Sequence, residues 1–287
     1  MINTSMYWIH TITPLHVGAG RGVDFVDLPI MREKTTGWPI VPGSGIKGVW
    51  RDHFFNSIPN KELIDTAFGK GSDGENEFAG SMVVTDARIV LLPVRSFYGT
   101  FAYVTSPLAL LRLKRDLENA NRKNIPDIPV LSDTQIFLAQ NRCLSNANKV
   151  YLEELDYGAQ VDSLAPQWAN YLAEEIFSED WKNVFKQRFA ILPDNSFDFF
   201  CQVGTEVNTR IRIDDETKIV AGTALWQEES LPAETVLAGL VWCDKVFGNG
   251  SITPEDVLSA FCKNEISCQI GGKSSIGKGQ VCCRFGK

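Results

Sequence analysis

The sequence has no long apolar run, and this absence excludes proteins that cross a membrane as helices. No segment approaches the roughly 18 consecutive apolar residues of a transmembrane helix. No basic leader followed by an apolar stretch precedes the chain's first strand. Hydrophobic residues make up 44% of the chain and charged residues 22%, as in ordinary globular proteins. We therefore expect a cytoplasmic protein with no membrane partner.

Paired cysteine motifs are also missing. The seven cysteines are scattered, and none of them forms a C-x-x-C pair. An odd count at irregular spacing argues against both a disulfide framework and a zinc site. Cys282 and Cys283 lie in an apparent strand and would point to opposite faces of its sheet. We expect reduced thiols that pack as small apolar residues.

The chain lacks an excess of positive charge, which argues against a nucleic-acid-binding protein because such proteins normally carry a basic surface. The net charge is −7 and the isoelectric point is near 5.1. The charge is unevenly distributed, however. Residues 1–53 carry five basic and four acidic residues, and residues 263–287 carry five basic residues and one acidic residue. An anion site is therefore expected near the two chain ends.

Glycines, prolines and charged residues concentrate in segment 13–51. The aromatic and β-branched residues of 6–13 predict a strand that ends before Pro14. Three glycines between positions 18 and 22 permit positive φ or a close approach of a ligand. The loop is not a dinucleotide-binding fingerprint, because extended chain rather than a helix is expected over 23–30. The segment therefore predicts a binding loop of another kind.

A helix is predicted to begin at the end of this segment, with Ser44 as its N-cap. Apolar residues recur at helical spacing along one face of it: Ile46, Val49, Trp50 and Phe54. Lys47 and Arg51 are four residues apart and share the opposite face. Helix N-terminal amides beside two aligned cations favour an anion site, such as one for a phosphate backbone. A solvated basic face is an equally good interpretation.

A second glycine-bearing turn is predicted near the C-terminal end, between strands at 266–270 and 280–285. Its polar and glycine residues are Gly271, Gly272, Lys273, Ser274, Ser275 and Lys278. It is not a P-loop, because Ser267 stands where the first glycine is required and a strand follows. Glycines and cations between two strands suit the close approach of a sugar–phosphate backbone.

Segments 206–213 and 218–226 alternate about a polar turn and predict a β-hairpin. Arg210 and Arg212 fall on one face of its first strand, where they suit phosphate contacts or simple surface exposure. Strand and helix signals alternate along the rest of the chain and indicate an α+β fold, without choosing one.

Two further features have structural and functional interpretations. Segment 164–192 is predicted to be helical, and its aromatic stripe is more typical of a protein interior than of base stacking. Arg88 and Arg95 flank a predicted strand at 80–92. Phosphate binding by Arg88 is no better supported than an ion pair with Asp86.

Short motifs that match one protein family are spread along nearly the whole chain. They are His16, 26–30, 32–33, 36–37, Pro39, 42–48, 86–88, 93–96, 101–108, 150–154 and 270–279. Together they resemble the RAMP superfamily of CRISPR effector proteins, most closely the Cas7-group backbone subunits of type III-B (Cmr) complexes. The resemblance is least specific over 118–200. It implies one domain over 1–287 with a ferredoxin-like (RRM-type) core, insertions, and a "thumb" hairpin at about 206–226.

The resemblance also implies function and partners. Such a subunit binds CRISPR guide RNA and cleaves complementary target RNA at regular intervals, beside kinks made by the thumb. The implied partners are both RNAs, further copies of the chain in a helical filament, and other Cmr subunits. The C-terminal glycine turn is implied to contact the guide. A non-catalytic architectural subunit, the related type III-A subunit and a guide-processing RAMP endonuclease stay open as alternatives.

The candidate catalytic residues are carboxylates. Asp24 and Asp27 lie in the N-terminal loop, and Glu228 is expected to approach them in the fold. From its residue type alone, Asp27 is a turn-forming residue. The resemblance implies instead a catalytic aspartate that holds a weakly bound divalent ion, Mg²⁺ or Mn²⁺. His16 and Glu228 match supporting positions, and Ser230 stands where some relatives have tyrosine.

Overall fold

The computed structural model describes residues 3–22, 26–70, 78–140, 143–214, 216–218, 220–247 and 251–286. The helices are α1 (Gly43–Ser57), α2 (Lys61–Phe68), α3 (Pro107–Asn119), α4 (Leu164–Ile176), α5 (Glu179–Arg188), α6 (Asp194–Val203), α7 (Pro254–Phe261) and the 3₁₀ turn η1 (Ser274–Ile276). Among these residues, no helix combines the length and apolarity that a membrane crossing requires.

The strands are short to moderate in length. They are β1 (Thr4–Thr11), β2 (Ile40–Val41), β3 (Gly69–Lys70), β4 (Phe78–Ala79), β5 (Val83–Val84), β6 (Ala87–Arg95), β7 (Phe101–Thr105), β8 (Gln135–Leu138), β9 (Lys149–Leu152), β10 (Leu155–Val161), β11 (Phe189–Ile191), β12 (Glu206–Ile213), β13 (Val220–Ser230), β14 (Val236–Trp242), β15 (Ile266–Gln269) and β16 (Gln280–Phe285).

Four strands form the centre of the main sheet, in the order β16-β1-β14-β6. Each neighbouring pair among them is antiparallel. The chain builds this unit as β1, α1, β6, β14, α7 and β16, which is the β-α-β-β-α-β order of the ferredoxin-like fold. The predicted ferredoxin-like α+β core is therefore confirmed. A long insertion between β6 and β14 enlarges it.

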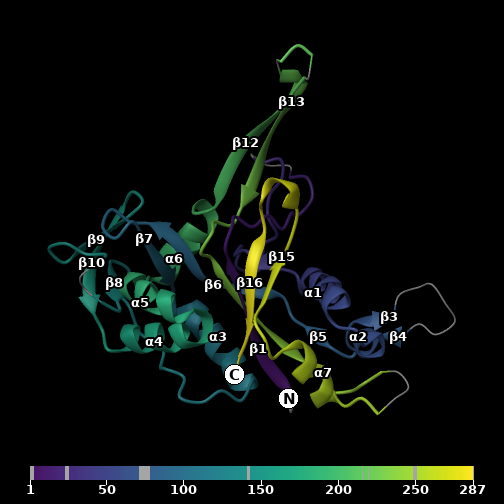
Figure 1. The fold of residues 1–287 in the computed structure, drawn as a ribbon. Helices are drawn as coiled ribbons and strands as arrows, with labels where there is room; N and C mark the ends of the chain where they lie inside the picture. Colours follow the sequence, from purple (N-terminus) through teal and green to yellow (C-terminus); the bar gives the residue numbers. More distant parts are fainter. Residues whose placement is uncertain are drawn as a thin grey trace.

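The sheet continues beyond the core because β6 is long enough to pair twice. Its first residues bond to β14 and its last residues to β7. The sheet then runs through β11, β8 and β10 to β9, with α3, α4 and α5 beside it on the left in Figure 1. The buried residues of α4 include Trp168, Leu172 and Ile176. The aromatic stripe of this segment is thus interior, as the sequence favours.

One part of the helical prediction for this segment is wrong. Residues Phe189–Ile191 form strand β11, which pairs in parallel with β7. All of the residues of β11 are buried. A short apolar run that is buried on every side has no periodicity with which to distinguish a strand from a helix.

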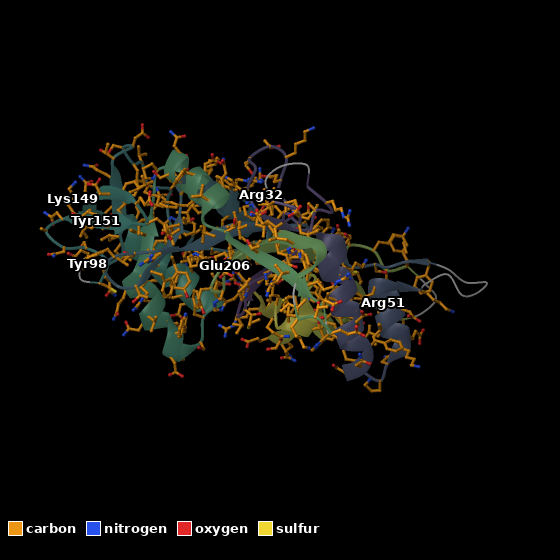
Figure 2. All side chains as sticks on the ribbon, turned by 90° about the horizontal axis from the view of Figure 1, so that it is seen from above. Arg32, Arg51, Tyr98, Lys149, Tyr151 and Glu206 are labelled. Carbon is orange, nitrogen blue, oxygen red and sulfur yellow. The ribbon has the colours of Figure 1, made fainter. Side chains whose placement is uncertain are left out.

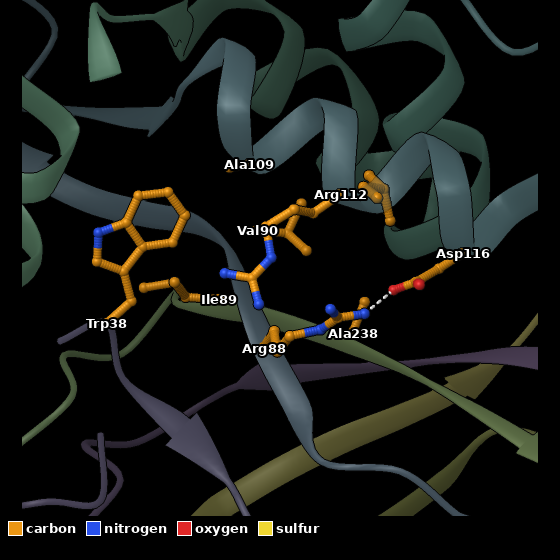
Figure 3. Close-up of a pocket in the computed structure, with 9 residues that line it drawn as sticks. Trp38, Arg88, Ile89, Val90, Ala109, Arg112, Asp116 and Ala238 are labelled. Atoms are coloured by element: carbon orange, nitrogen blue, oxygen red, sulfur yellow. Dashed lines mark hydrogen bonds and ion pairs between the residues drawn. The ribbon is translucent and has the colours of Figure 1, made fainter. Parts of the chain in front are cut away.

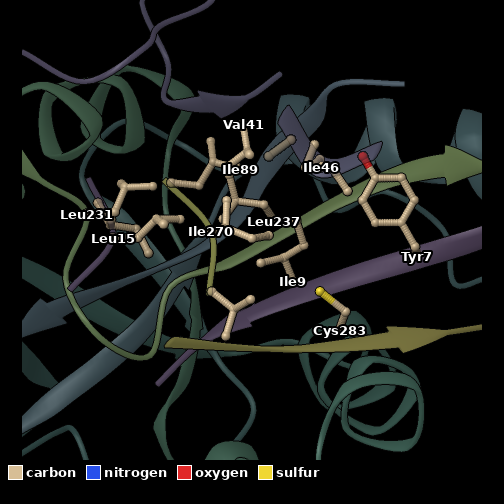
Figure 4. Packing of buried hydrophobic residues seen from close by; sticks show 14 of the residues in the cluster. Tyr7, Ile9, Leu15, Val41, Ile46, Ile89, Leu231, Leu237, Ile270 and Cys283 are labelled. Atoms are coloured by element: carbon tan, nitrogen blue, oxygen red, sulfur yellow. The ribbon is translucent and has the colours of Figure 1, made fainter. Parts of the chain in front are cut away.

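Strand β1 lies at the centre of the core and is buried on both faces. Tyr7 and Ile9 pack in one hydrophobic cluster, whereas Met6 and Trp8 pack in another. Figure 4 shows Tyr7 and Ile9 among residues of α1, β6, β14 and β16, including Cys283. The aromatic and β-branched composition of β1 follows from its burial on both faces.

All seven cysteines are free.

Helix α1 begins two residues earlier than predicted, and Ser44 is not its cap. The N-cap is Pro42, which makes no side-chain cap bond. Instead, the Gly43 N–H donates to Asp86 Oδ1 at 2.8 Å. A Cβ at position 43 would lie 2.3 Å from the Val84 carbonyl oxygen, so glycine is needed there. The prediction failed because the capping carboxylate is distant in sequence.

The predicted hairpin is present and stands apart from the main sheet, at the top of Figure 1. Strands β12 and β13 pair with each other from Glu206 opposite Ser230 to Ile211 opposite Leu225 and beyond. The structure extends the second strand to Ser230. Ile211 is 47% exposed and Leu225 is 60% exposed, so the hairpin has little of its own core.

A polar network ties β1 to the helical layer. The Tyr103 hydroxyl donates to Glu234 Oε2 at 2.5 Å, and His10 Nε2 lies 2.8 Å from the same oxygen. Trp181 Nε1 donates to the Tyr103 hydroxyl at 2.9 Å. Burial raises the pKa of Glu234. The hydrogen bond and the charge of His10, with the hydrogen bond of Tyr103, lower this pKa by more than burial raises it, so the pKa of Glu234 lies below its usual value.

This network gives a prediction about acid stability. A depressed carboxylate pKa contributes stability above the unfolded-state pKa and loses it as pH falls through the folded-state pKa. Glu234→Gln should therefore lower the free energy of unfolding near neutral pH by about 1–3 kcal/mol. The difference from wild type should shrink as pH falls below the ordinary glutamate value of 4.5. Urea unfolding of both proteins near neutral pH and below pH 4.5 measures this difference in unfolding free energy. Glu118→Gln, at an exposed position, is the control. A difference that grows in acid would contradict this account.

Candidate functional site

The two glycine-bearing turns lie against each other although they are far apart in sequence. The Gly272 N–H donates to the His16 carbonyl at 2.9 Å, and the Gly279 N–H donates to the Pro14 carbonyl at 2.9 Å. Gly271 has φ +78°, and a Cβ there would lie 2.3 Å from the His16 oxygen. In Figure 1 the C-terminal turn rises beside the N-terminal loop toward the hairpin base. The two glycine-bearing turns are therefore joined at one place in the fold.

His16 lies at this junction and is 6% exposed. Its Nδ1 is 2.6 Å from the Glu229 carbonyl oxygen. Because a carbonyl oxygen only accepts, Nδ1 carries a hydrogen and donates it to this oxygen. Nε2 faces Gly18, where a Cβ would be 2.9 Å away. These contacts make His16 a residue that orients the loop, the C-terminal turn and the hairpin base.

Asp27 lies on a segment that is bonded along the base of β13. The Leu28 N–H donates to the Gln227 carbonyl at 3.0 Å, and the Glu229 N–H donates to the Leu28 carbonyl at 3.0 Å. The Gln227 N–H also donates to Asp27 Oδ2 at 2.8 Å. This pairing brings Asp27 and Glu228 onto adjacent segments, as the sequence leads one to expect. Asp24 lies outside the described residues.

The Glu228 side chain is buried, with 2% of its surface exposed. Its Oε1 accepts hydrogen bonds from Lys273 Nζ and from Trp226 Nε1, both at 2.7 Å. Its Oε2 lies 3.6 Å from Arg210 Nε. Burial raises the pKa of Glu228, but the hydrogen bonds of Lys273 and Trp226 outweigh it, and the pKa is lowered overall. Glu228 is therefore an ionised anchor for neighbouring side chains.

Lys278 anchors the C-terminal turn to the hairpin base. It is 5% exposed, and its Nζ donates to Ser230 Oγ at 2.7 Å. Burial lowers the pKa of Lys278, and the charge of Glu228 partly opposes that shift. Burial raises the pKa of nearby Glu206, and the charge of Lys278 partly opposes that rise. A lysine predicted to bind RNA is thus enclosed by protein.

An open pocket of about 590 Å³ lies where these segments meet. Its lining residues are Arg21, Gly22, Asp27, Leu28, Ala224, Leu225, Trp226 and Lys273. The pocket combines one carboxylate, two cations and an indole ring. Cations attract a phosphate, an aromatic face stacks on a base, and a carboxylate holds a proton or a cation. This combination suits a phosphodiester beside an unstacked nucleotide.

The predicted basic face of α1 is separate from this pocket. Lys47 Nζ donates to the Met82 carbonyl at 2.6 Å, and burial lowers the pKa of Lys47. Ser44 is exposed. Figure 2 shows Arg51 on α1, apart from Glu206 at the hairpin base. RNA binding by Ser44, Lys47 and Arg51 stays a prediction. To bind RNA, Lys47 would have to break its hydrogen bond to the Met82 carbonyl.

Three other residues assigned to RNA contact are exposed. Arg212 lies on β12 beyond Arg210, and Ser274 and Ser275 form part of the η1 turn. They flank the pocket without lining it.

Arg88 is not available in this structure as a phosphate ligand. It pairs with Asp116 on α3, not with Asp86 (Figure 3). Nearby, Arg112 makes two hydrogen bonds to Glu33, at 2.5 and 2.8 Å. Arg88, Arg112 and Asp116 border the small pocket drawn in Figure 3, and both arginines are held in ion pairs. We therefore assign Arg88 a structural role.

Arg21 and Trp226 supply a cation and an indole ring to the pocket, and neither was among the predicted site residues. Trp226 lies opposite Arg210 in the hairpin and two residues before Glu228, so all three share one face. Trp226 could have been identified by counting back two residues from Glu228 along the strand. Counting forward from the turn of the hairpin would have failed, because the register shifts between Ile211 and Ile213. Arg21 has no comparable signal, because it lies in an irregular loop.

The chain is similar to known proteins along nearly its whole length. A sequence model for the RAMP superfamily matches residues 8–282. The "CRISPR system Cmr endoribonuclease Cmr4" of Pyrococcus furiosus is 38% identical over 277 residues, which cover 95% of this chain and 92% of that protein. The crystal structure of oligomeric Cmr4 from Pyrococcus furiosus matches with a TM-score of 0.76 and 30% identity, covering 99% of this chain and 98% of that one.

A chain of the type III-B Cmr-beta complex bound to cognate target RNA matches with a TM-score of 0.74. Its identity is 22%, and the match covers 98% of this chain and 96% of that one. At this identity the likeness shows the fold alone.

The packing of His16 against Gly18 gives a second prediction. Gly18→Ala should push the His16 ring away from its place, because the added Cβ would meet Nε2 at 2.9 Å. We expect about 1–3 kcal/mol of lost unfolding free energy and faster amide exchange in 271–279, since the Gly272 amide depends on His16. Hydrogen-exchange mass spectrometry and urea unfolding measure both effects. Gly48→Ala is the matched control, because a Cβ there meets nothing within 4 Å. Unchanged exchange in 271–279 would contradict the junction role.

Proposed function

Because the chain belongs to the RAMP superfamily, we propose that it is a backbone subunit of a type III-B CRISPR complex, which binds guide RNA and cleaves complementary target RNA. The observation that carries this proposal is the pocket in which Asp27 and Lys273 meet below the hairpin. The identity of 38% to a Cmr4 endoribonuclease supports cleavage of RNA. The oligomeric Cmr4 relative supports self-association among the proposed partners.

The reaction needs no external nucleophile. The 2′-oxygen of the target strand attacks the adjacent phosphorus, forming one P–O bond while the bond from phosphorus to the 5′-oxygen breaks. The 2′-hydroxyl loses a proton and the 5′-oxygen gains one, which leaves a cyclic phosphate and a 5′-hydroxyl. The site has to align the attacking oxygen, remove its proton and stabilise the departing oxygen.

Asp27 is suited to the attacking side of this reaction. Its Oδ2 is fixed by the Gln227 N–H at 2.8 Å. Among the described residues, Oδ1 has no hydrogen-bond partner, and Asp27 lines the open pocket. A carboxylate held through one oxygen presents the other in a defined direction, where it can take the 2′-hydroxyl proton through a water bound to it.

We also propose a divalent ion at Asp27. Within the described ranges, no group of three or more His, Cys, Asp or Glu residues is arranged to hold a metal. The donor set nevertheless fits Mg²⁺ or Mn²⁺, because Mg²⁺ is commonly held by one or two carboxylates together with substrate phosphates. When bound, such an ion supplies a positive charge that polarises the phosphate. Since Asp27 would be its main protein ligand, binding without RNA should be weak.

The surrounding residues are suited to hold RNA. Arg212, Ser274 and Ser275 are exposed next to the pocket, and we assign them, with Arg210 and the backbone of Gly271 and Gly272, to the sugar–phosphate backbone of the guide. The hairpin would act as the thumb over the duplex. Repeated copies in a helical filament, together with other Cmr subunits, would present one such pocket per copy along the guide.

The third prediction concerns Asp27. Asp27→Asn keeps an oxygen for the Gln227 N–H and removes the charge, so the assembled complex should cleave on the order of 10²–10⁴-fold more slowly. Binding of guide and target should be nearly unchanged. Labelled complementary RNA with Mg²⁺ measures the rate, and exposed Asp133→Asn is the control.

Three other results would be decisive in different ways. Loss of both binding and cleavage would make Asp27 structural. Unchanged cleavage would remove Asp27 from the mechanism, and no cleavage by wild type would favour the architectural subunit. Products from precursor repeat RNA without target would favour a guide-processing enzyme.

The fourth prediction concerns the ion. Chelation by EDTA should stop target cleavage by the wild-type complex, and Mg²⁺ or Mn²⁺ should restore it. The Asp27→Asn complex should recover little activity at any metal concentration, because its main protein ligand has lost its charge. Full activity in EDTA would overturn the metal proposal while leaving the nuclease proposal standing.

A further inference from the structure

We propose that Lys273 is a catalytic residue, which stabilises the departing 5′-oxygen and gives it a proton. This inference rests on the proposed function of the site. The sequence grouped Lys273 with the other residues of the C-terminal turn as a guide-RNA ligand. The structure separates it from them, because Lys273 lines the pocket that also holds Asp27, whereas Ser274 and Ser275 do not.

The two lysines of the turn have different environments. Lys278 is 5% exposed and is fixed to Ser230, which accounts for the attachment of the turn to the hairpin base. The Lys273 side chain is 32% exposed and reaches into the pocket. A lysine that served only to join the two segments would repeat what Lys278 already does. The exposed ammonium of Lys273 is the one placed to meet a ligand.

Glu228 fixes the direction of this ammonium. One N–H of Lys273 Nζ donates to Glu228 Oε1 at 2.7 Å, and the same oxygen accepts from Trp226 Nε1 at 2.7 Å. An ammonium has three donors, so two are left for phosphate oxygens. Glu228 is 2% exposed and is therefore a positioning residue that acts through Lys273. Preorganised charge of this kind stabilises a transition state without reorganisation during the reaction.

The position of Lys273 also fits the geometry of the reaction. An in-line displacement puts the attacking and leaving oxygens on opposite sides of the phosphorus. Asp27 and Lys273 enter one pocket from different chain ends, so a phosphate between them meets a carboxylate and an ammonium. As the bond from phosphorus to the 5′-oxygen breaks, the ammonium passes a proton to that oxygen. Water then restores the proton to the amine.

The test uses a target RNA with a sulfur in place of the 5′-oxygen at one cleavage site. A thiolate leaves without needing a proton, so a residue that assists the departing oxygen is no longer required. In the assembled complex, Lys273→Ala should slow cleavage of the normal RNA on the order of 10²–10³-fold. With the sulfur-containing RNA, its rate should come within about tenfold of wild type. Guide content and target affinity should stay near those of wild type.

Two controls accompany this measurement. Lys263→Ala removes an exposed lysine remote from the pocket and should leave both rates unchanged. Glu228→Gln combined with Lys273→Ala should be no slower than Lys273→Ala alone, because Glu228 acts through Lys273. An additive loss in the double variant would contradict that positioning role.

The outcomes separate this inference from the function on which it rests. Equal slowing of both RNAs, no slowing, or loss of guide from the Lys273→Ala complex would overturn the role of Lys273. If Asp27→Asn abolishes cleavage in the same assay, the nuclease proposal survives any of these results. If the wild-type complex cuts neither RNA, the proposed function itself fails.

Discussion

The hydrogen bonds that join the two chain ends are the constraint on which the site depends. The His16 carbonyl accepts a hydrogen bond from the C-terminal turn, and its ring N–H donates one to the base of the hairpin. Gly18 and Gly271 leave no room for a Cβ beside it. In a ferredoxin-like sheet the first and last strands are neighbours, so the loops at their ends meet without further machinery. Fold topology thus places the loop that carries Asp27 beside the basic C-terminal turn.

Charge at this junction is arranged around one buried carboxylate. Glu228 accepts from Lys273 and Trp226 and lies close to Arg210, so it is surrounded by donors from three segments. A buried charge is tolerated when it is paired and hydrogen-bonded. The arrangement explains how a chain with a net charge of −7 presents a cationic pocket. The acidic excess lies elsewhere in the sequence, and Glu228 holds the Lys273 ammonium at the pocket by a hydrogen bond.

Much of the fold was predictable because local signals and packing agree. The hairpin at 206–226 follows from the alternation of its residues, and β15 and β16 were predicted to within one residue of their observed bounds. The fold choice came from motif resemblance, since periodicity alone does not distinguish α+β folds. The failures were non-local. Asp86 caps α1 in place of Ser44, and strand β11 has no period to read.

The candidate site was predicted in outline. His16, Asp27, Glu228 and the glycine turn do meet, but their individual tasks depend on burial, which a sequence does not display. The most direct test is a structure of the assembled complex with target RNA that carries a 2′-deoxy substitution at the cleavage site. We predict that the intact phosphate lies in the pocket, within hydrogen-bonding distance of Lys273 Nζ and facing Asp27. A phosphate bound on the α1 face, with the pocket empty of RNA, would contradict the account.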